Sequence, residues 1–96
     1  MMSKQYEIKS LEGINWDSHD DRSNLDYKII FSELLESKSI EVGDTVAVDY
    51  EYIESLGRIV YYVTFNKPNV IYLEEGFFLD ECKILFGEDF DYGVSQ

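Results

Sequence analysis

The stretch Thr45-Val46-Ala47-Val48-Asp49-Tyr50-Glu51-Tyr52 decides the fold. In a β-strand successive side chains point to opposite faces, so every second residue lies on the same side. One side of this strand carries only Val and Tyr, whereas the other carries Thr, Ala and two carboxylates. The pattern predicts a half-buried strand, entered through a turn at Val42-Gly43-Asp44.

The sequence beyond this strand keeps the two-residue period and is broken by turn residues. Ser55-Leu56-Gly57 predicts a turn into a second strand at 58–65, which is apolar on both faces and is therefore expected to be central. Asn66-Lys67-Pro68-Asn69 predicts the next turn. The remaining expected elements are a third strand at 70–73 that 74–76 ends, a stretch at 77–79 that fits strand or helical turn, and a closing strand at 83–86.

The sequence before residue 40 has a different character. A short strand is expected at 5–9, and the polar stretch 12–24 has no period and is expected to be a loop. A helix is expected at 24–37, capped by Ser23 with Asp26, although 27–31 is also rich in strand-forming residues. One face of this helix would carry Tyr27, Ile30, Phe31, Leu34 and Leu35.

These elements predict an α+β fold in which one helix packs on a small, strongly bent antiparallel sheet of about four to five strands. The layout of 40–86, with its Val-Gly-Asp opening and two hairpins, resembles an SH3-like, partly closed barrel in architecture only. We expect a single domain over 1–96. Its parts are a strand with an irregular lead-in at 1–23, the helix at 24–37, an antiparallel meander at 40–86 and an acidic tail at 87–96.

The charge balance restricts the classes of partner. The chain has 20 Asp plus Glu against 8 Lys plus Arg, which gives a formal net charge of −12. Binding to phosphates or to an anionic membrane surface needs basic residues, so neither nucleic acid nor membrane is an expected direct partner. The eight Tyr and six Phe indicate a folded core and not a disordered acidic chain. A basic protein is the expected partner, including a protein that itself binds nucleic acid.

Residues able to carry catalysis are few. His19 is the sole histidine, and the cluster Trp16-Asp17-Ser18-His19-Asp20-Asp21 matches no metal-loop spacing. Cys82 is the sole cysteine, and the neighbouring carboxylates disfavour its thiolate. We therefore expect no catalytic residue, no metal, no cofactor and no enzymatic activity. The single cysteine and the lack of an apolar leader also favour a cytoplasmic protein.

The acidic residues fall into three concentrations along the chain. The first is Asp17, Asp20, Asp21 and Asp26; the second is Glu41, Asp44, Asp49, Glu51 and Glu54; the third is Glu74, Glu75, Asp80, Glu81, Glu88, Asp89 and Asp91. Tyrosine is enriched at binding hot spots, so the nearby tyrosines are candidates for the centre of an interface. The predicted partner-binding residues are Asp44, Asp49, Glu51, Glu54, Glu74, Glu75, Asp80, Glu81, Glu88, Asp89, Asp91, Tyr50, Tyr52 and Tyr92, with Phe90 as a further aromatic candidate.

The function that this composition favours is inhibition by charge mimicry, in which carboxylates on a rigid frame occlude a basic, nucleic-acid-binding surface of a partner protein. In size and acidity the chain is similar, at class level only, to counter-defence proteins of phages and mobile elements. One alternative is an immunity protein or assembly subunit that binds a basic protein without mimicry. Another is a small-ligand or metal-binding β-barrel. A homodimer through an exposed strand edge is also compatible with the sequence.

Overall fold

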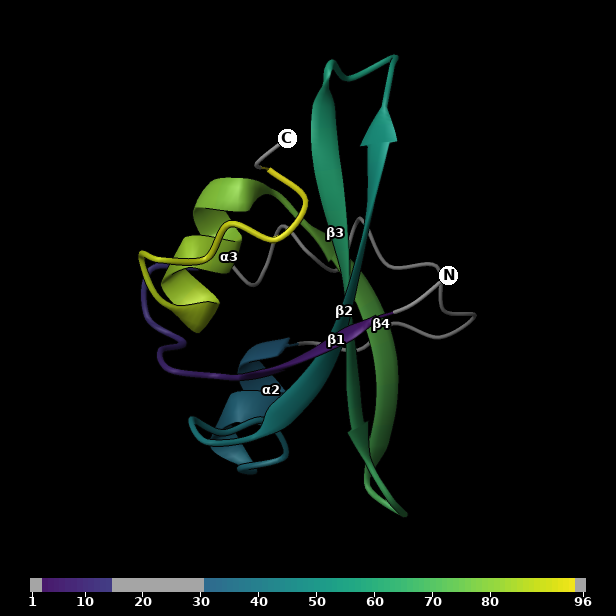
Figure 1. Cartoon of the computed structure of the whole chain (residues 1–96). Helices are drawn as coiled ribbons and strands as arrows, with labels where there is room; N and C mark the ends of the chain where they lie inside the picture. Colours follow the sequence, from purple (N-terminus) through teal and green to yellow (C-terminus); the bar gives the residue numbers. More distant parts are fainter. Residues whose placement is uncertain (1–2, 15–30, 95–96) are drawn as a thin grey trace.

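The computed structural model describes residues 3–14 and 31–94. Its described part is an α+β fold with a four-stranded antiparallel sheet in the order β1-β2-β3-β4. The elements in chain order are β1 (Lys4–Glu7), α2 (Phe31–Glu36), β2 (Thr45–Ile53), β3 (Arg58–Lys67), β4 (Ile71–Phe77) and α3 (Leu79–Phe86). Figure 1 shows α3 and the C-terminal segment together on one side of the sheet.

The sheet confirms the strand prediction for 45–52 and the central position predicted for the next strand. β3 pairs with β2 on one side, with Tyr50 opposite Tyr61, and with β4 on the other, with Phe77 opposite Tyr61. β1 confirms the strand expected near the N-terminus and lies antiparallel to the first half of β2.

The core lies between the sheet and α3. Successive side chains of β3 alternate in burial, so Tyr61, Val63 and Phe65 are buried on one face. Helix α3 covers that face with Cys82, Leu85 and Phe86, which are spaced three and four residues apart and so share one side of the helix. A helix packed on an antiparallel sheet is thus confirmed.

The strand predicted at 83–86 is wrong, because these residues form the second half of α3. A four-residue apolar run fits a strand or one side of a helix equally well, so periodicity alone does not separate them.

The third strand was also predicted too short. β4 continues through Glu74, Glu75 and Gly76 to Phe77, so the stretch expected to end the strand belongs to it.

The expected partly closed barrel is not formed: the sheet is open, and the meander expected over 40–86 ends at Phe77.

The stretch expected to be an acidic tail packs on the core over residues 87–94. Phe90 is buried and its ring lies 5.3 Å from that of Phe86. The Tyr61 hydroxyl donates a hydrogen bond of 2.6 Å to the backbone carbonyl of Tyr92. These contacts fix the C-terminal segment against the sheet.

The helix expected at 24–37 is confirmed in its last part by α2, while residues 24–30 lie outside the described residues. The loop expected at 12–24 is described only over residues 12–14. Leu35 of α2 is half-buried and packs against the core.

The buried hydroxyl of Tyr61 makes stability depend on alkaline pH. Burial is the main cause that raises the pKa of Tyr61 to about 12, with smaller contributions from nearby groups such as Cys82 and Tyr50. Because an unfolded tyrosine titrates near pH ~10, the folded chain holds this proton more tightly. The resulting stabilisation is complete below about pH 10 and is lost as the pH rises to about 12.

We therefore expect the free energy of unfolding to fall by about 2–3 kcal/mol between pH ~10 and pH ~12 because of Tyr61. The measurement is urea unfolding followed by circular dichroism across this range, for the natural chain and for Tyr61→Phe. The variant should start less stable, since it loses the hydrogen bond to Tyr92, and should decline less steeply. Parallel declines of the two proteins would contradict this assignment.

Candidate partner-binding surface

Four exposed carboxylates surround α3 and the segment that follows it: Asp80, Glu88, Asp89 and Asp91. We call these four residues the helix-side surface. Asp80 lies in the first turn of α3, where the positive end of the helix dipole favours a negative charge. The other three follow the helix on a backbone that buried Phe86 and Phe90 fix to the core. The four carboxylates are therefore held on a folded frame.

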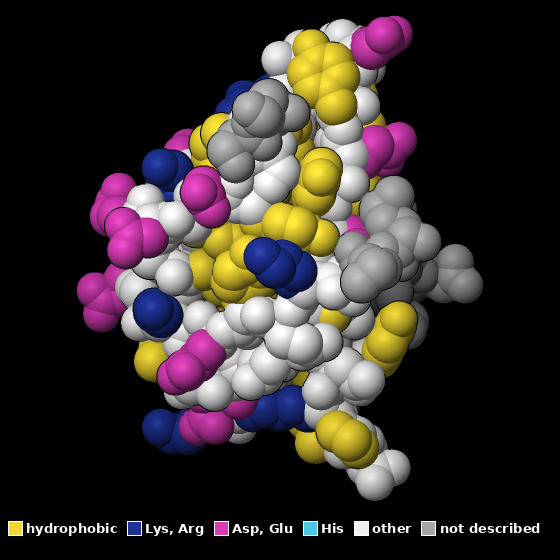
Figure 2. Space-filling model, viewed as in Figure 1, with side chains coloured by type: hydrophobic (Ala, Val, Ile, Leu, Met, Phe, Trp, Pro, Cys, Tyr) yellow, Lys and Arg dark blue, Asp and Glu magenta, His cyan; other side chains and the backbone are white. Residues whose placement is uncertain are grey.

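Among the residues that the structure describes, no cation forms an ion pair with the helix-side surface. Within residues 3–14 and 31–94, none of the four carboxylates lies within ion-pair distance of a Lys or Arg. Lys83 is close, but its Nζ donates to the backbone carbonyl of Glu88 at 3.4 Å. Figure 2 shows acidic side chains gathered along the left margin, on the side of α3 and the C-terminal segment, with Lys or Arg side chains among them.

Two of the predicted tyrosines meet beside this surface. The rings of Tyr50 and Tyr92 pack edge to face, with centroids 4.8 Å apart, and Nζ of Lys4 lies 5.1 Å above the ring of Tyr92. Gly93 has a φ of +78°, and a Cβ there would lie 2.9 Å from the Tyr50 ring, so the close approach requires glycine.

Tyr6 joins these two tyrosines, because its ring centroid lies 6.0 Å from that of Tyr92. We call Tyr6, Tyr50 and Tyr92 the tyrosine cluster. Burial is the main cause that raises the pKa of Tyr92, and the charge of Asp49 contributes next. Burial also raises the pKa of Tyr6, with contributions from Tyr92 and from Asp91. Asp49 thus contributes to the raised pKa of Tyr92 and Asp91 to that of Tyr6, although the two carboxylates are 42 positions apart in the sequence.

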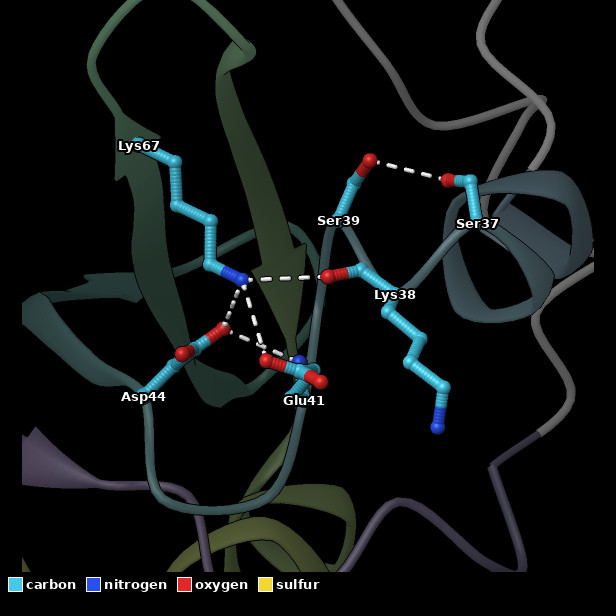
Figure 3. A network of polar contacts seen from close by, with 6 residues as sticks. All are labelled: Ser37, Lys38, Ser39, Glu41, Asp44 and Lys67. Carbon is cyan, nitrogen blue, oxygen red and sulfur yellow. Dashed lines mark hydrogen bonds and ion pairs between the residues drawn. The ribbon is translucent and has the colours of Figure 1, made fainter.

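Asp44 lies elsewhere, in a polar network at the start of β2 (Figure 3). Nζ of Lys67 lies 3.2 Å from the Asp44 carboxylate and 3.5 Å from that of Glu41, and it donates to the Lys38 carbonyl at 3.2 Å. The Asp44 carboxylate also accepts the backbone N–H of Glu41 at 2.9 Å. Its charge is thus used to fasten the loop before β2 to the end of β3.

The two glutamates of β4 are on opposite faces of the sheet. Glu74 is exposed on the face away from α3. Glu75 is 2% exposed and lies on the core face opposite Val63, with its Oε1 accepting the Gly76 N–H at 2.9 Å. Glu75 and Phe90, which is 4% exposed, are therefore buried in this structure and not part of its surface.

The remaining predicted residues lie at or near the β2–β3 hairpin. Glu54 is in the turn, and Tyr52 is 59% exposed at the end of β2. Glu51 is exposed on the other face of β2 and accepts a hydrogen bond of 3.1 Å from the Tyr62 hydroxyl. Burial raises the pKa of Tyr62, and this hydrogen bond adds to the increase.

The described carboxylates therefore do not form one face. The helix-side surface lies over the core face of the sheet, whereas Glu51 and Glu74 lie on the opposite face by their strand register. The first concentration, at Asp17, Asp20, Asp21 and Asp26, lies outside the described residues. What the structure brings together is the helix-side surface with Tyr92 and Tyr50, whereas Asp49 lies on the opposite face of β2 with Glu51.

Glu81 has a structural use that accounts for its position. Its Oε1 accepts the backbone N–H of Phe78 at 2.9 Å, which satisfies a donor at the start of α3.

We expect Glu81→Ala to lower the free energy of unfolding by about 1 kcal/mol. Glu81→Gln should lower it by less, because the glutamine side chain keeps an oxygen that can accept this hydrogen bond. Urea unfolding measures both, with Glu88→Ala as the exposed control. Equal stability of Glu81→Ala and Glu88→Ala would contradict the capping role.

Of the residues considered for catalysis, Cys82 lies in the described part of the chain. Cys82 is buried, and burial, followed by the charges of Glu81 and Asp80, raises the pKa of its thiol. Among the described residues no group of three His, Cys, Asp or Glu side chains could hold a metal ion. The cluster 16–21 with His19 lies outside them. No helix of the described residues is long and apolar enough to span a membrane.

Comparisons with protein-family models, with curated proteins and with solved structures find no match for this chain. The interpretation of the surface therefore rests on the geometry of this structure.

The sequence analysis did not predict that Lys4, Tyr6 and Gly93 would lie in and around the tyrosine cluster. A glycine directly after an aromatic residue can indicate close approach of another group, so Gly93 was an available signal. Lys4 and Tyr6 gave none, because the strand register that places them is not visible in sequence.

Proposed function

We propose that this chain is a non-enzymatic binding protein that inhibits a basic partner protein by occupying the partner's nucleic-acid-binding surface. The observation that carries the proposal is the helix-side surface, four exposed carboxylates without an ion pair to any described residue, fixed on a packed frame. Carboxylates held in this way keep their charge available, and they meet Arg and Lys of a phosphate-binding groove without a large ordering cost.

The tyrosine cluster beside the surface supports the same function. Tyr50 is 37% exposed and Tyr92, which follows Asp91 in the chain, is half-buried, so both rings are partly accessible beside the helix-side surface. Tyrosine and charged groups together are typical of interfaces in which aromatic contacts supply affinity and charges supply orientation and speed of association.

Capture from a lysate of the encoding organism tests the proposal. The immobilised chain is expected to retain nucleic-acid-binding proteins near ~50 mM salt and to release them near ~200 mM, because screening weakens contacts between charged surfaces. Retained proteins are then identified by mass spectrometry. Retention of a partner that does not change with salt, or of proteins without affinity for nucleic acid, would contradict charge mimicry. The second result would favour an immunity protein or an assembly subunit.

A further inference from the structure

Strand β2 is longer than the neighbour that covers its outer edge. β1 pairs with residues Thr45 to Val48 of β2, and Lys4, at the start of β1, lies opposite Val48. On its other side β2 stays paired with β3 as far as Ile53. Residues 49–53 therefore have a strand on one side only, as far as the described residues go. We call this five-residue stretch the open edge.

Part of the open edge's backbone makes no hydrogen bond to any other residue that the structure describes. Alternate residues of a paired strand direct their N–H and C=O groups away from the partner strand. Beyond its pairing with β3, the stretch makes one further set of backbone bonds among the described residues, in which the Ile53 carbonyl accepts from Leu56 and Gly57 in the hairpin turn. An edge of this kind is where an extended peptide adds as a new strand.

The side chains of the open edge specify what such a strand should carry. Asp49 and Glu51 lie on one face of β2, while Tyr50 and Tyr52 lie on the other. Residues directly opposite each other on paired strands interact, and opposite charges there are favourable. Basic side chains therefore suit the positions that face Asp49 and Glu51, and apolar or cationic side chains suit those that face the tyrosine rings.

The chain itself already shows a cation placed this way. Lys4 occupies the last paired position of β1, and its Nζ lies over the ring of Tyr92. Tyr92 packs against Tyr50, which belongs to the next position along β2 on the same face. A strand continuing the line of β1 along β2 would thus bring its next side chains onto the same tyrosine cluster.

We propose that the open edge of β2 binds an extended, basic segment of the partner protein as an additional antiparallel strand in line with β1. The inference rests on the proposed function and names the part of the partner that this chain recognises. The added strand would pair its basic residues with Asp49 and Glu51 and would lie beside Asp91 of the helix-side surface.

A second copy of this chain fits the edge less well than a basic segment does. An antiparallel self-pairing centred on Glu51 puts two Glu51 carboxylates opposite each other. Centring it on Tyr50 puts Asp49 opposite Glu51. Like charges directly opposite each other destabilise a strand pair, and each chain carries a formal net charge of −12.

A short synthetic peptide in which Lys and Val alternate is the probe. We expect it to shift and protect the backbone amides of residues 49–53 in NMR spectra and hydrogen exchange, and a peptide with all Lys before all Val to bind more weakly. Two versions of the alternating peptide, N-methylated on one or the other set of alternate residues, test the backbone contact. One version should bind and the other should not, because only one set of N–H groups faces β2.

Matched charge reversals test the position of the site. Glu51→Lys is expected to weaken peptide binding about tenfold, whereas Glu36→Lys, the same charge change on helix α2, should have much less effect. Equal binding of the two N-methylated peptides, equal effects of the two reversals, or protection outside 49–53 would overturn the open-edge proposal and leave the charge-based function standing. A concentration-dependent dimer that the peptide disrupts would assign the edge to a second copy and also overturn the proposal.

Discussion

Phe77→Ala is expected to lower the free energy of unfolding by about 3–5 kcal/mol. Phe77 is fully buried at the end of β4, opposite Tyr61, and its ring packs at 6.3 Å from that of Phe65. Truncation removes these contacts and leaves a cavity between the sheet and α3, which begins two residues later. Since a domain of this size is stable by only about 5–14 kcal/mol, the loss is a large share of the total.

The matched control is Tyr72→Ala, on the same strand but on the other face. Tyr72 is 62% exposed, so its truncation should change stability by about 0.5 kcal/mol or less. Urea unfolding followed by circular dichroism measures both variants. A loss in Tyr72→Ala as large as that in Phe77→Ala would contradict the register of β4 and the position of the core.

Neutralising the helix-side surface is expected to weaken binding of the captured partner about thirtyfold. The variant is Asp80→Asn, Glu88→Gln, Asp89→Asn and Asp91→Asn together. Each exposed charge at an interface contributes about 0.5 kcal/mol, and four of them give about 2 kcal/mol. The loss should come mainly from slower association, which stopped-flow or surface-based kinetics resolves from dissociation.

The matched control removes the same number of charges elsewhere. Four exposed glutamates are changed to Gln, which gives the same net charge as the first variant: Glu12, Glu33, Glu36 and Glu74. This control should bind several-fold more tightly than the helix-side variant. Equal losses in the two variants would show that net charge alone governs binding and would contradict a localised surface. Circular dichroism of both variants checks that the fold is retained.

Local patterns predicted the part of the fold in which one face is apolar and the other is not. The alternation in 45–52 and the apolar run at 58–65 are long enough to specify two strands. The strand at 70–73 was ended too early because Glu75 occupies a core-facing position between Leu73 and Phe77. A buried carboxylate breaks the apolar period without breaking the strand.

The helix α3 shows a different limit. Its buried residues are Cys82, Leu85 and Phe86. The last two belong to the apolar run at 84–86, which in sequence resembles a short strand. Only the contact of the helix with β3 and the cap from Glu81 distinguish it, and both depend on tertiary structure.

The candidate surface was predictable in composition and not in arrangement. Exposed carboxylates at Asp80, Glu88, Asp89 and Asp91 follow from the excess of acidic residues near the C-terminus. That Lys67 would engage Asp44, and that β1 would pair with only the first half of β2, depends on loop paths and strand lengths. Sequence periodicity contains no information on which strand pairs with which.

Competition between this chain and nucleic acid for the captured partner tests the central claim most directly. The partner is bound to a fluorescently labelled nucleic acid, and the acidic chain is titrated in while anisotropy is recorded. The account predicts complete displacement of the nucleic acid, with a midpoint that rises as salt is added and that rises further for the helix-side variant. A stable ternary complex, in which the partner holds the acidic chain and the nucleic acid at once, would contradict it.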